Sequence, residues 1–334
     1  MVAELGSTGT VADARSGAGP CSGWGATTQV VKQALNSVPI LSPTPHGAAS
    51  AHGAGWMDDM GIDVAILGYG AIGRSVHLLL AQHPERVRVL GVLDRAVLAK
   101  EGPKPSRRSA GPPEARVPVL DLPTAIKRAD LVIECASPSA VRAHGPEIIA
   151  AGADLLVASL GALVDERLGA QLHAGPGRCH LSTGAIGGLD LIRSAAGAIE
   201  AIELETVKLP AALLHPGLSG TQREDIERAQ ATGSPVRVFI GSVPDAVAGF
   251  PSNINVAAAL GLAAGDLSVV RVSITADPTA TLTSHTITVR GETGKHRFEI
   301  RNFPDPANPA SSALTARAIA SGVLHLAGVG PHFI

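Results

Sequence analysis

From residue 62 onward, short apolar runs alternate with segments in which apolar residues recur every three or four positions. Runs with the length and β-branched content of buried parallel strands occupy residues 62–67, 86–93, 130–135, 154–160 and 178–181. Helical spacing occupies residues 71–82, 138–151 and 164–173. Strands that alternate with helices in this way predict a doubly wound parallel α/β sheet over residues 62–184.

After about residue 185, strand-like segments follow one another without regular helices between them. They occupy residues 201–209, 236–241, 268–276, 284–290 and 295–301, with a hairpin turn at 291–294. Helical spacing returns at 255–264 and 310–327. We therefore expect a second, α+β domain at 185–308 with an open, mainly antiparallel sheet and helices on one of its faces. The helix of the final segment, 309–334, is a candidate to return to the first domain.

Composition narrows the class of protein. Residues 1–61 are rich in Gly, Ala, Ser, Thr and Pro and lack periodicity, so we expect a flexible leader and no signal peptide. The 27 basic and 29 acidic residues nearly balance, and aromatics make up only 2%, which argues against a nucleic-acid binder. The apolar runs are too short for a membrane span. Three widely spaced cysteines predict neither disulfides nor a metal site, which is typical of a cytoplasmic protein.

A Gly-x-Gly-x-x-Gly sequence lies between the first predicted strand and the first predicted helix. Gly68 permits a tight turn, Gly70 lets the backbone approach a pyrophosphate, and Gly73 lets helix and strand pack closely. Ala71 and Ile72 begin the helix, whose N-terminal N–H groups favour phosphate. In this strand–turn–helix context the motif predicts a dinucleotide-binding Rossmann domain.

The choice between NAD and NADP depends on the end of the second strand. Asp94 lies there, where its carboxylate can accept a hydrogen bond from a ribose 2′-hydroxyl, which favours NAD. Arg95 follows at once, and the loop 100–118 adds basic residues that can meet a 2′-phosphate or simply be solvated. Both cofactors stay open, with NAD slightly favoured.

Further blocks of sequence resemble the L-aspartate dehydrogenase family. They are Glu-Cys-Ala-Ser at 134–137, Val-Ala-Ser-Leu-Gly-Ala-Leu at 157–163, Thr-Gly-Ala-Ile-Gly-Gly-Leu-Asp at 183–190, Phe-Pro-Ser-Asn-Ile-Asn-Val-Ala-Ala at 250–258 and Asn-Pro at 308–309. The resemblance implies a Rossmann domain followed by a catalytic domain related to dihydrodipicolinate reductase. It also implies NAD(P)-dependent oxidation of L-aspartate to iminosuccinate, which either hydrolyses to oxaloacetate and ammonia or enters NAD biosynthesis.

The same resemblance assigns roles to single residues. A family histidine about 30 residues beyond the Phe-Pro-x-Asn-x-Asn block corresponds to His285 and implies the catalytic residue. The family's cofactor-contacting alanine and asparagine correspond to Ala185 and Asn255. Ala136 and Ser137, which follow the third predicted strand, are further candidate cofactor contacts.

The residues themselves are consistent with amine oxidation, which requires a base for the ammonium proton and a cation for carboxylates. A neutral imidazole, with an ordinary pKa of about 6.5, suits the first task. His285 lies in a predicted strand, where the alternative is a buried histidine satisfied by a threonine. Lys208 is either a carboxylate clamp or a solvated strand end. Asn253 and Asn255 can bind the nicotinamide end or cap the following helix.

Two other functions stay open. One is an NAD(P)-dependent dehydrogenase or imine reductase for a related amino acid, since the segment 211–235 matches the family only loosely. The other is a protein that senses the dinucleotide without turnover. Because an open sheet normally has its face or edge covered, we also expect a homodimer formed through the second domain.

Overall fold

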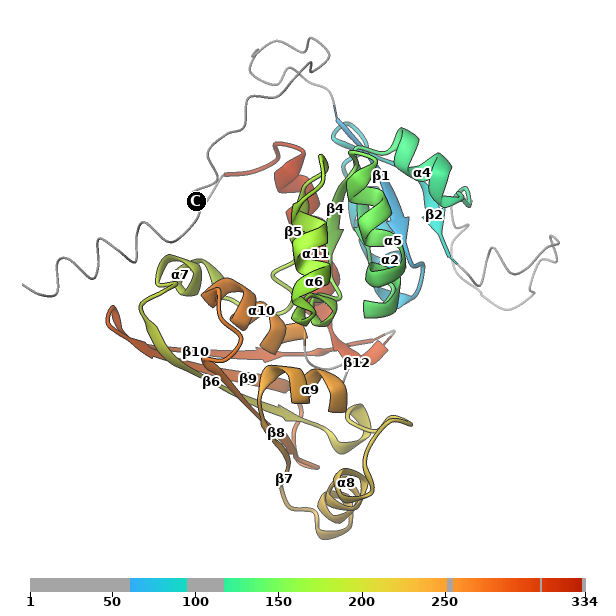
Figure 1. Ribbon diagram of the computed structural model, residues 1–334. Helices are drawn as coiled ribbons and strands as arrows, with labels where there is room; N and C mark the ends of the chain where they lie inside the picture. The colour runs from blue at the N-terminus through green and yellow to red at the C-terminus, as the bar shows by residue number, and fades with distance from the viewer. Residues whose placement is uncertain (1–60, 95–116, 251–254, 307, 332–334) are drawn as a thin grey trace, which may run out of the picture. The chain divides into compact units, whose positions relative to one another are not determined.

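The computed structural model describes residues 61–94, 117–250, 255–306 and 308–331, and Figure 1 labels its elements. The first half of these residues forms a parallel sheet with the strand order β2-β1-β3-β4-β5. Its strands are β1 (Ile62–Leu67), β2 (Val87–Leu93), β3 (Leu131–Glu134), β4 (Asp154–Val157) and β5 (Cys179–Leu181). The predicted parallel sheet is confirmed. The expected leader, 1–61, lies outside the described residues except for Gly61.

Helices cover both faces of this sheet. Alternate residues of β1 belong to two different apolar clusters, Val64 and Ile66 to one and Ala65 and Leu67 to the other. The first cluster includes residues of α2 (Ala71–Leu80) and α11 (Ala313–Leu326), and the second includes residues of α4 (Leu122–Arg128), α5 (Pro138–Ala150) and α6 (Glu166–His173). Burial on both faces is the reason that the strands have almost uninterrupted apolar sequences.

The strand predicted over 154–160 is shorter in the structure, and side-chain contacts give the reason. It ends at Val157, because the next two backbone N–H groups donate to the Glu134 carboxylate instead of to a neighbouring strand. The chain then forms a 3-10 helix, η1 (Leu160–Val164). Helix α6 begins slightly later than predicted because Asp165 caps its first turn.

A second sheet has the strand order β10-β9-β6-β8-β7. Its strands are β6 (Ile199–Lys208), β7 (Val236–Gly241), β8 (Val270–Ala276), β9 (Thr283–Gly291) and β10 (Gly294–Asn302). Strands β6 and β8 are parallel, and the other neighbours are antiparallel. Gly291 pairs with Gly294 across the predicted hairpin turn. The mainly antiparallel second sheet is therefore confirmed.

The expected helix at 255–264 and the expectation of helices on one face of this sheet are confirmed, but the expectation that no regular helix separates the strands is wrong. Figure 1 shows α7 (Leu189–Ser194), α9 (Val243–Gly249) and α10 (Asn255–Ala264) on one face of the sheet. Between β6 and β7 the chain also forms a short 3-10 helix, η2 (Pro210–Ala212), and α8 (Gly220–Thr232). Helix α8 is almost entirely polar and has little apolar periodicity, so periodicity did not predict it.

The C-terminal helix starts later than predicted. Residues 308–312 form β12 (Asn308–Ser312), which pairs with the short β11 (Pro304–Asp305). Ser312 then caps α11 by accepting a hydrogen bond from the N–H of Leu314. Helix α11 packs against α2 and the parallel sheet through Ile319 and Val323, so the two ends of the described chain share one core.

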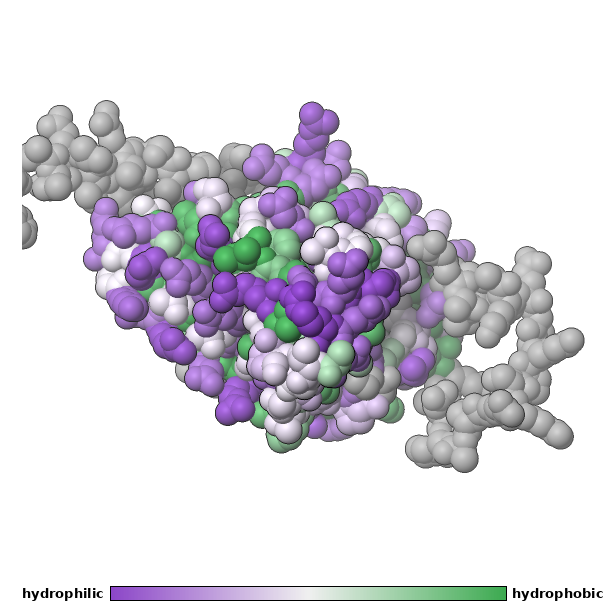
Figure 2. All heavy atoms as spheres, turned by 90° about the horizontal axis from the view of Figure 1, so that it is seen from below, coloured by the Kyte–Doolittle hydropathy of each residue, from purple (hydrophilic) through white to green (hydrophobic). Residues whose placement is uncertain are grey.

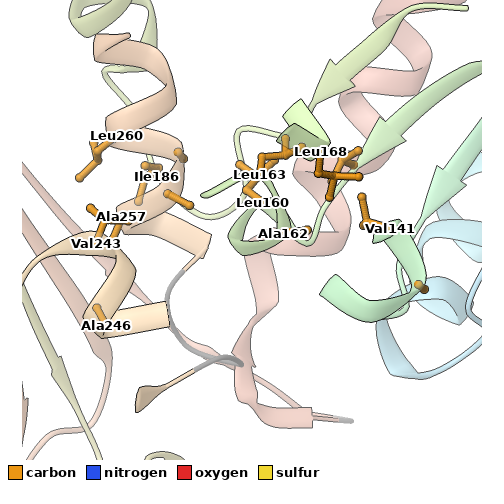
Figure 3. Packing of buried hydrophobic residues seen from close by; sticks show 14 of the residues in the cluster. Val141, Leu160, Ala162, Leu163, Leu168, Ile186, Val243, Ala246, Ala257 and Leu260 are labelled. Atoms are coloured by element: carbon orange, nitrogen blue, oxygen red, sulfur yellow. The ribbon is translucent and has the colours of Figure 1, made fainter. Parts of the chain in front are cut away.

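A continuous apolar core joins the two sheets. Figure 3 shows Leu160 and Leu163 of η1 facing Ala257 and Leu260 of α10, with α9 alongside. The N–H of Gly161 also donates to Oδ1 of Asn255 at 3.1 Å, so a polar contact spans the same junction. Because α10 presents mainly alanine here, its backbone approaches η1 closely.

The other face of the second sheet is polar. Along β6, the buried residues Ile202 and Leu204 alternate with the exposed Glu203 and Glu205, as expected for a sheet covered on one side. Figure 2, which views this side from below, shows mainly hydrophilic residues interrupted by a few apolar ones. Within the described ranges, no helix is long and apolar enough to cross a membrane.

Candidate active site

The glycine turn after β1 has the geometry of a phosphate cradle. Gly68 has a φ of 96°, and a Cβ there would lie 2.6 Å from the Cβ of Ala136. A Cβ at Gly73 would lie 2.1 Å from the Gly68 carbonyl oxygen. A Cβ at Gly70 would meet nothing within 4 Å, so this glycine leaves open space at the N-terminus of α2. That space suits the backbone approach and helix dipole that a pyrophosphate requires.

A cavity of about 320 Å³ lies beside the turn and reaches the end of β2. Its lining includes Gly68, Gly70 and Asp94. The Asp94 carboxylate accepts a hydrogen bond from the N–H of Tyr69 at 3.0 Å, which holds it at the carboxyl end of the strand. Arg95 and most of the basic loop lie outside the described residues.

A larger cavity of about 580 Å³ continues from the first, because Cys135, Ala136 and Ser137 line both. It opens at the carboxyl ends of β3 and β4, next to the point where the strand order reverses between β1 and β3. Ligands of open α/β sheets bind at such switch points. The predicted residues that line it are Ile72, Ala136, Ser137, Ala185, Lys208, Asn255 and His285. Ala71 begins α2 but is absent from the described lining of both cavities.

His285 enters this cavity from β9. It pairs in register with Thr206 of β6, and Thr206 Oγ1 lies 3.0 Å from His285 Nδ1. The imidazole is only 3% exposed. Burial, and then the nearby charge of Lys208, lowers the pKa of His285 to about 3. The free protein therefore holds this ring neutral at ordinary pH.

Lys208 reaches the same cavity from the end of β6. Its side chain is buried, and burial lowers the pKa of its ammonium to about 8. The group is still mainly protonated at neutral pH. A buried cation beside a neutral imidazole is an arrangement suited to an anionic ligand.

Asn255 and Ala185 are held by contacts that link the two halves of the site. The Asn255 side chain accepts from Gly161 of η1, so the structure shows it tying the two sheets together, where the sequence also suggested a helix cap. The carbonyl of Ala185 accepts a hydrogen bond from Asn302 Nδ2 at 2.8 Å. Asn253 lies outside the described residues.

Helix N-termini add positive potential to the cavity. Asn255 and Val256 of α10 line it, and so do Ser312 and Thr315 at the start of α11. The segment 211–235 contributes no residue to the described lining, so the loosely matching segment is not part of this wall as described.

Three residues of the site were missed by sequence reasoning. Thr206 and Asn302 hold His285 and Ala185, and Glu134 holds the loops after β3 and β4. Each of the three bonds to a residue at least 24 positions away along the chain, and no local pattern reveals that contact. Cys135 lines both cavities, but burial raises the pKa of its thiol, which disfavours a nucleophilic thiolate. In the part of the chain that the structure describes, no three His, Cys, Asp or Glu side chains gather to hold a metal.

This fold and site define an NAD(P)-dependent oxidoreductase with a Rossmann domain followed by a second, mainly antiparallel sheet. Residues 68–176 match the family model described as the NAD binding domain of homoserine dehydrogenase. Residues 190–326 match the model described as the C-terminal domain of aspartate dehydrogenase.

Individual relatives agree with these matches. An L-aspartate dehydrogenase of Ruegeria pomeroyi is 34% identical over 269 residues, covering 79% of this chain and 92% of that protein. One of Methanopyrus kandleri is 33% identical over 265 residues, covering 76% and 92%. The crystal structure of Thermotoga maritima aspartate dehydrogenase superposes with a TM-score of 0.59 at 27% identity, covering 82% and 99%. The chain belongs to the aspartate dehydrogenase family.

Proposed function

We propose that the protein oxidises L-aspartate to iminosuccinate with NAD or NADP. The observation that carries this proposal is a shared cavity: His285 and Lys208 open into the same space as the loops that follow β3 and β4 of the dinucleotide-binding domain. The relatives that match most of the chain are L-aspartate dehydrogenases. The product then hydrolyses to oxaloacetate and ammonia or enters NAD biosynthesis.

The two connected cavities fit an extended dinucleotide. In this proposal Asp94 binds the adenosine ribose, Gly70 and the N-terminus of α2 hold the pyrophosphate, and Ala185 and Asn255 contact the nicotinamide end. When bound, the nicotinamide supplies the acceptor for the hydride that leaves the substrate's Cα. The preference between NAD and NADP is a matter for the assay below.

His285 takes the proton of the substrate's ammonium group. For this it needs its lone pair on Nε2, so we assign the proton to Nδ1, which then donates to Thr206 Oγ1 at 3.0 Å. In the free protein the low pKa of His285 makes it a weak base. A carboxylate bound beside Lys208 offsets the ammonium charge, which is the smaller of the two causes of the low pKa, and so raises the pKa of the imidazole. Substrate binding thereby makes His285 a stronger base than it is in the free protein.

Lys208 and the helix N-termini recognise carboxylates. Lys208 is a buried cation, and residues at the starts of α10 and α11 line the cavity, where helix N-termini carry positive potential. Two separate positive features suit a substrate with two carboxylates better than one with a single carboxylate. This is the reason that we place aspartate ahead of a neutral amino acid.

A substrate panel tests the proposal. Purified protein is mixed with NAD or NADP and, in turn, L-aspartate, D-aspartate, L-glutamate or L-alanine, and the reduced nicotinamide is followed by absorbance. We expect turnover with L-aspartate above all others. Turnover confined to another amino acid would show that this amino acid, and not L-aspartate, is the substrate. Dinucleotide binding without turnover of any amino acid would favour a sensor.

We also propose that the protein is a homodimer joined through the open face of its second sheet. That face carries both charge signs, for example the Glu203–Arg290 ion pair at 2.9 Å, and within the described residues Glu203 and Glu205 of β6 are exposed on it. A two-fold interface is self-complementary, so mixed charges can pair with themselves across it.

A further inference from the structure

Glu134 is the most completely buried charged residue of the described chain, with 0% exposure. It ends β3, and its carboxylate accepts five hydrogen bonds. Four come from the backbone N–H groups of Ala136, Ser137, Ala158 and Ser159, at 2.8–3.1 Å, and the fifth comes from the Ser159 hydroxyl at 2.9 Å. No step of the proposed reaction uses this residue.

The donors belong to two different loops. Ala136 and Ser137 follow β3, whereas Ala158 and Ser159 follow the neighbouring strand β4, 24 and 25 residues further along the chain. One carboxylate therefore fixes both loops by their backbones. Its Oε1 receives both N–H groups of the first loop, and its Oε2 receives both of the second.

These loops form one side of the cavity that contains His285. All four donor residues line the larger cavity, and the first pair also lines the smaller one. Their N–H groups are turned toward Glu134, so the donors themselves are occupied, and what they offer to a ligand is the position of their Cα and side-chain atoms. The shape of this wall depends on the length and charge of one side chain.

We propose that Glu134 is a positioning residue for the nicotinamide end of the dinucleotide. It sets the wall formed by the loops after β3 and β4 so that the nicotinamide lies at the height of His285. The inference rests on the part of the proposed function that places the nicotinamide in the larger cavity, and it holds whichever amino acid is oxidised.

The hydrogen-bond pattern shows which variants are informative. Burial raises the pKa of the Glu134 carboxyl, and the hydrogen bonds from Ser159, Ala136 and Ser137 oppose that effect. In Glu134→Gln, an NH₂ group replaces one of the two oxygens. Whichever way the amide is turned, that group faces two N–H groups, and donors cannot bond to donors. Glu134→Asp keeps both acceptors but is shorter by one methylene.

The test measures dissociation constants of NADH and of ADP-ribose, which lacks nicotinamide, by fluorescence and calorimetry. We expect Glu134→Gln to weaken NADH binding by about tenfold or more, since two buried donors lose their partners. We expect the binding of ADP-ribose to weaken less, because only Ala136 and Ser137 of the four donor residues line the smaller cavity, which also keeps Gly68, Gly70 and Asp94. The dissociation constant of NADH for Glu134→Asp should lie between those for the natural protein and for Glu134→Gln. If Glu134→Gln does not fold, Glu134→Asp takes its place in the test.

A matched control separates positioning from general stability. Ile226→Ala removes a fully buried side chain of α8, and no residue of α8 lines either cavity as described. It should lower the melting temperature as Glu134→Gln does and leave NADH binding unchanged. The proposal is overturned if Glu134→Gln and Glu134→Asp bind NADH as tightly as the natural protein. It is also overturned if the variants lose equal factors of affinity for NADH and for ADP-ribose. Neither measurement includes an amino acid, so its outcome is independent of whether L-aspartate is the substrate.

Discussion

At the scale of single residues, strand register determines which hydroxyl orients the imidazole of the candidate base. Thr206 and His285 are 79 residues apart in the chain, but they face each other on adjacent strands. Period-two alternation turns both toward the helix-covered side, where Ile287 and Val289 are also buried. The hydroxyl therefore orients a ring that already lies in the cavity.

Removing that hydroxyl tests whether it orients the ring. Thr206→Val keeps the shape of the side chain and should lower kcat about tenfold, the cost of one lost hydrogen bond in the reacting state. Thr206→Ser should restore most of the activity, and the KM for the dinucleotide should stay constant in both. Steady-state kinetics of the natural protein and both variants gives the values of kcat and KM. Equal kcat in the valine and natural proteins would show that the contact does not matter for turnover.

The pKa of Lys208 predicts a pH effect on binding of carboxylates. Burial lowers this pKa to about 8, so the charge is present below that pH and is lost as the pH rises through it. Succinate, which stays doubly ionised over this range, should inhibit competitively with a Ki that rises above about pH 8. In Lys208→Arg the charge persists, so the Ki should stay flat. A Ki in the natural protein that does not depend on pH would remove Lys208 from the carboxylate site.

At the scale of elements, two glycines of the turn between β1 and α2 have different roles, Gly73 in folding and Gly70 in binding. Gly73→Ala would force a Cβ into the Gly68 carbonyl and should cost about 3 kcal/mol of stability. Gly70→Ala meets no atom and should fold normally, but its methyl group occupies the space of the pyrophosphate and should weaken NADH binding at least about tenfold.

Gly169→Ala is the control for the turn variants. It adds a methyl group in open space on α6, which is away from both dinucleotide cavities. Denaturation midpoints and NADH titrations of the three variants give the comparison. If Gly70→Ala binds NADH as Gly169→Ala does, the dinucleotide does not approach this turn.

How far the elements can be predicted from sequence depends on what stabilises them. Strands such as β1 are buried on both faces, so their apolar runs are sufficient to predict them. Helix α8 buries only Ile226 and Ala229 and therefore has no apolar stripe. Its start carries a local signal, the capping box of Ser219 and Gln222, which apolar periodicity does not detect.

The residues of the candidate site also differ in whether the sequence predicts them. His285, Lys208 and Asn255 were found because strand ends, helix starts and the family resemblance are all readable along the chain. Glu134 lies near the end of a predicted apolar strand and begins the Glu-Cys-Ala-Ser block, but two of the backbone groups that it holds follow the next strand. Contacts made only by tertiary folding, such as this one, leave no spacing to detect.

At the scale of the whole molecule, the open face of the second sheet predicts the oligomeric state. Light scattering should give twice the monomer mass of 33.8 kDa. Glu205→Arg reverses an exposed charge in the centre of that face and should shift the protein toward monomer, whereas Glu227→Arg, on exposed α8, should not. A monomeric mass for the natural protein would contradict the dimer.

The two sheets share a core and a cavity, and in the proposed reaction His285 is the base of this common site. The most direct test compares the natural protein with His285→Ala, using L-aspartate and NAD or NADP at alkaline pH. We predict steady reduction of the nicotinamide by the natural protein, a loss of about a hundredfold or more in the variant, and equal NADH binding by both. If His285→Ala turns over L-aspartate as fast as the natural protein, His285 is not the base. If the natural protein binds NADH but does not turn over L-aspartate, the proposed reaction is contradicted.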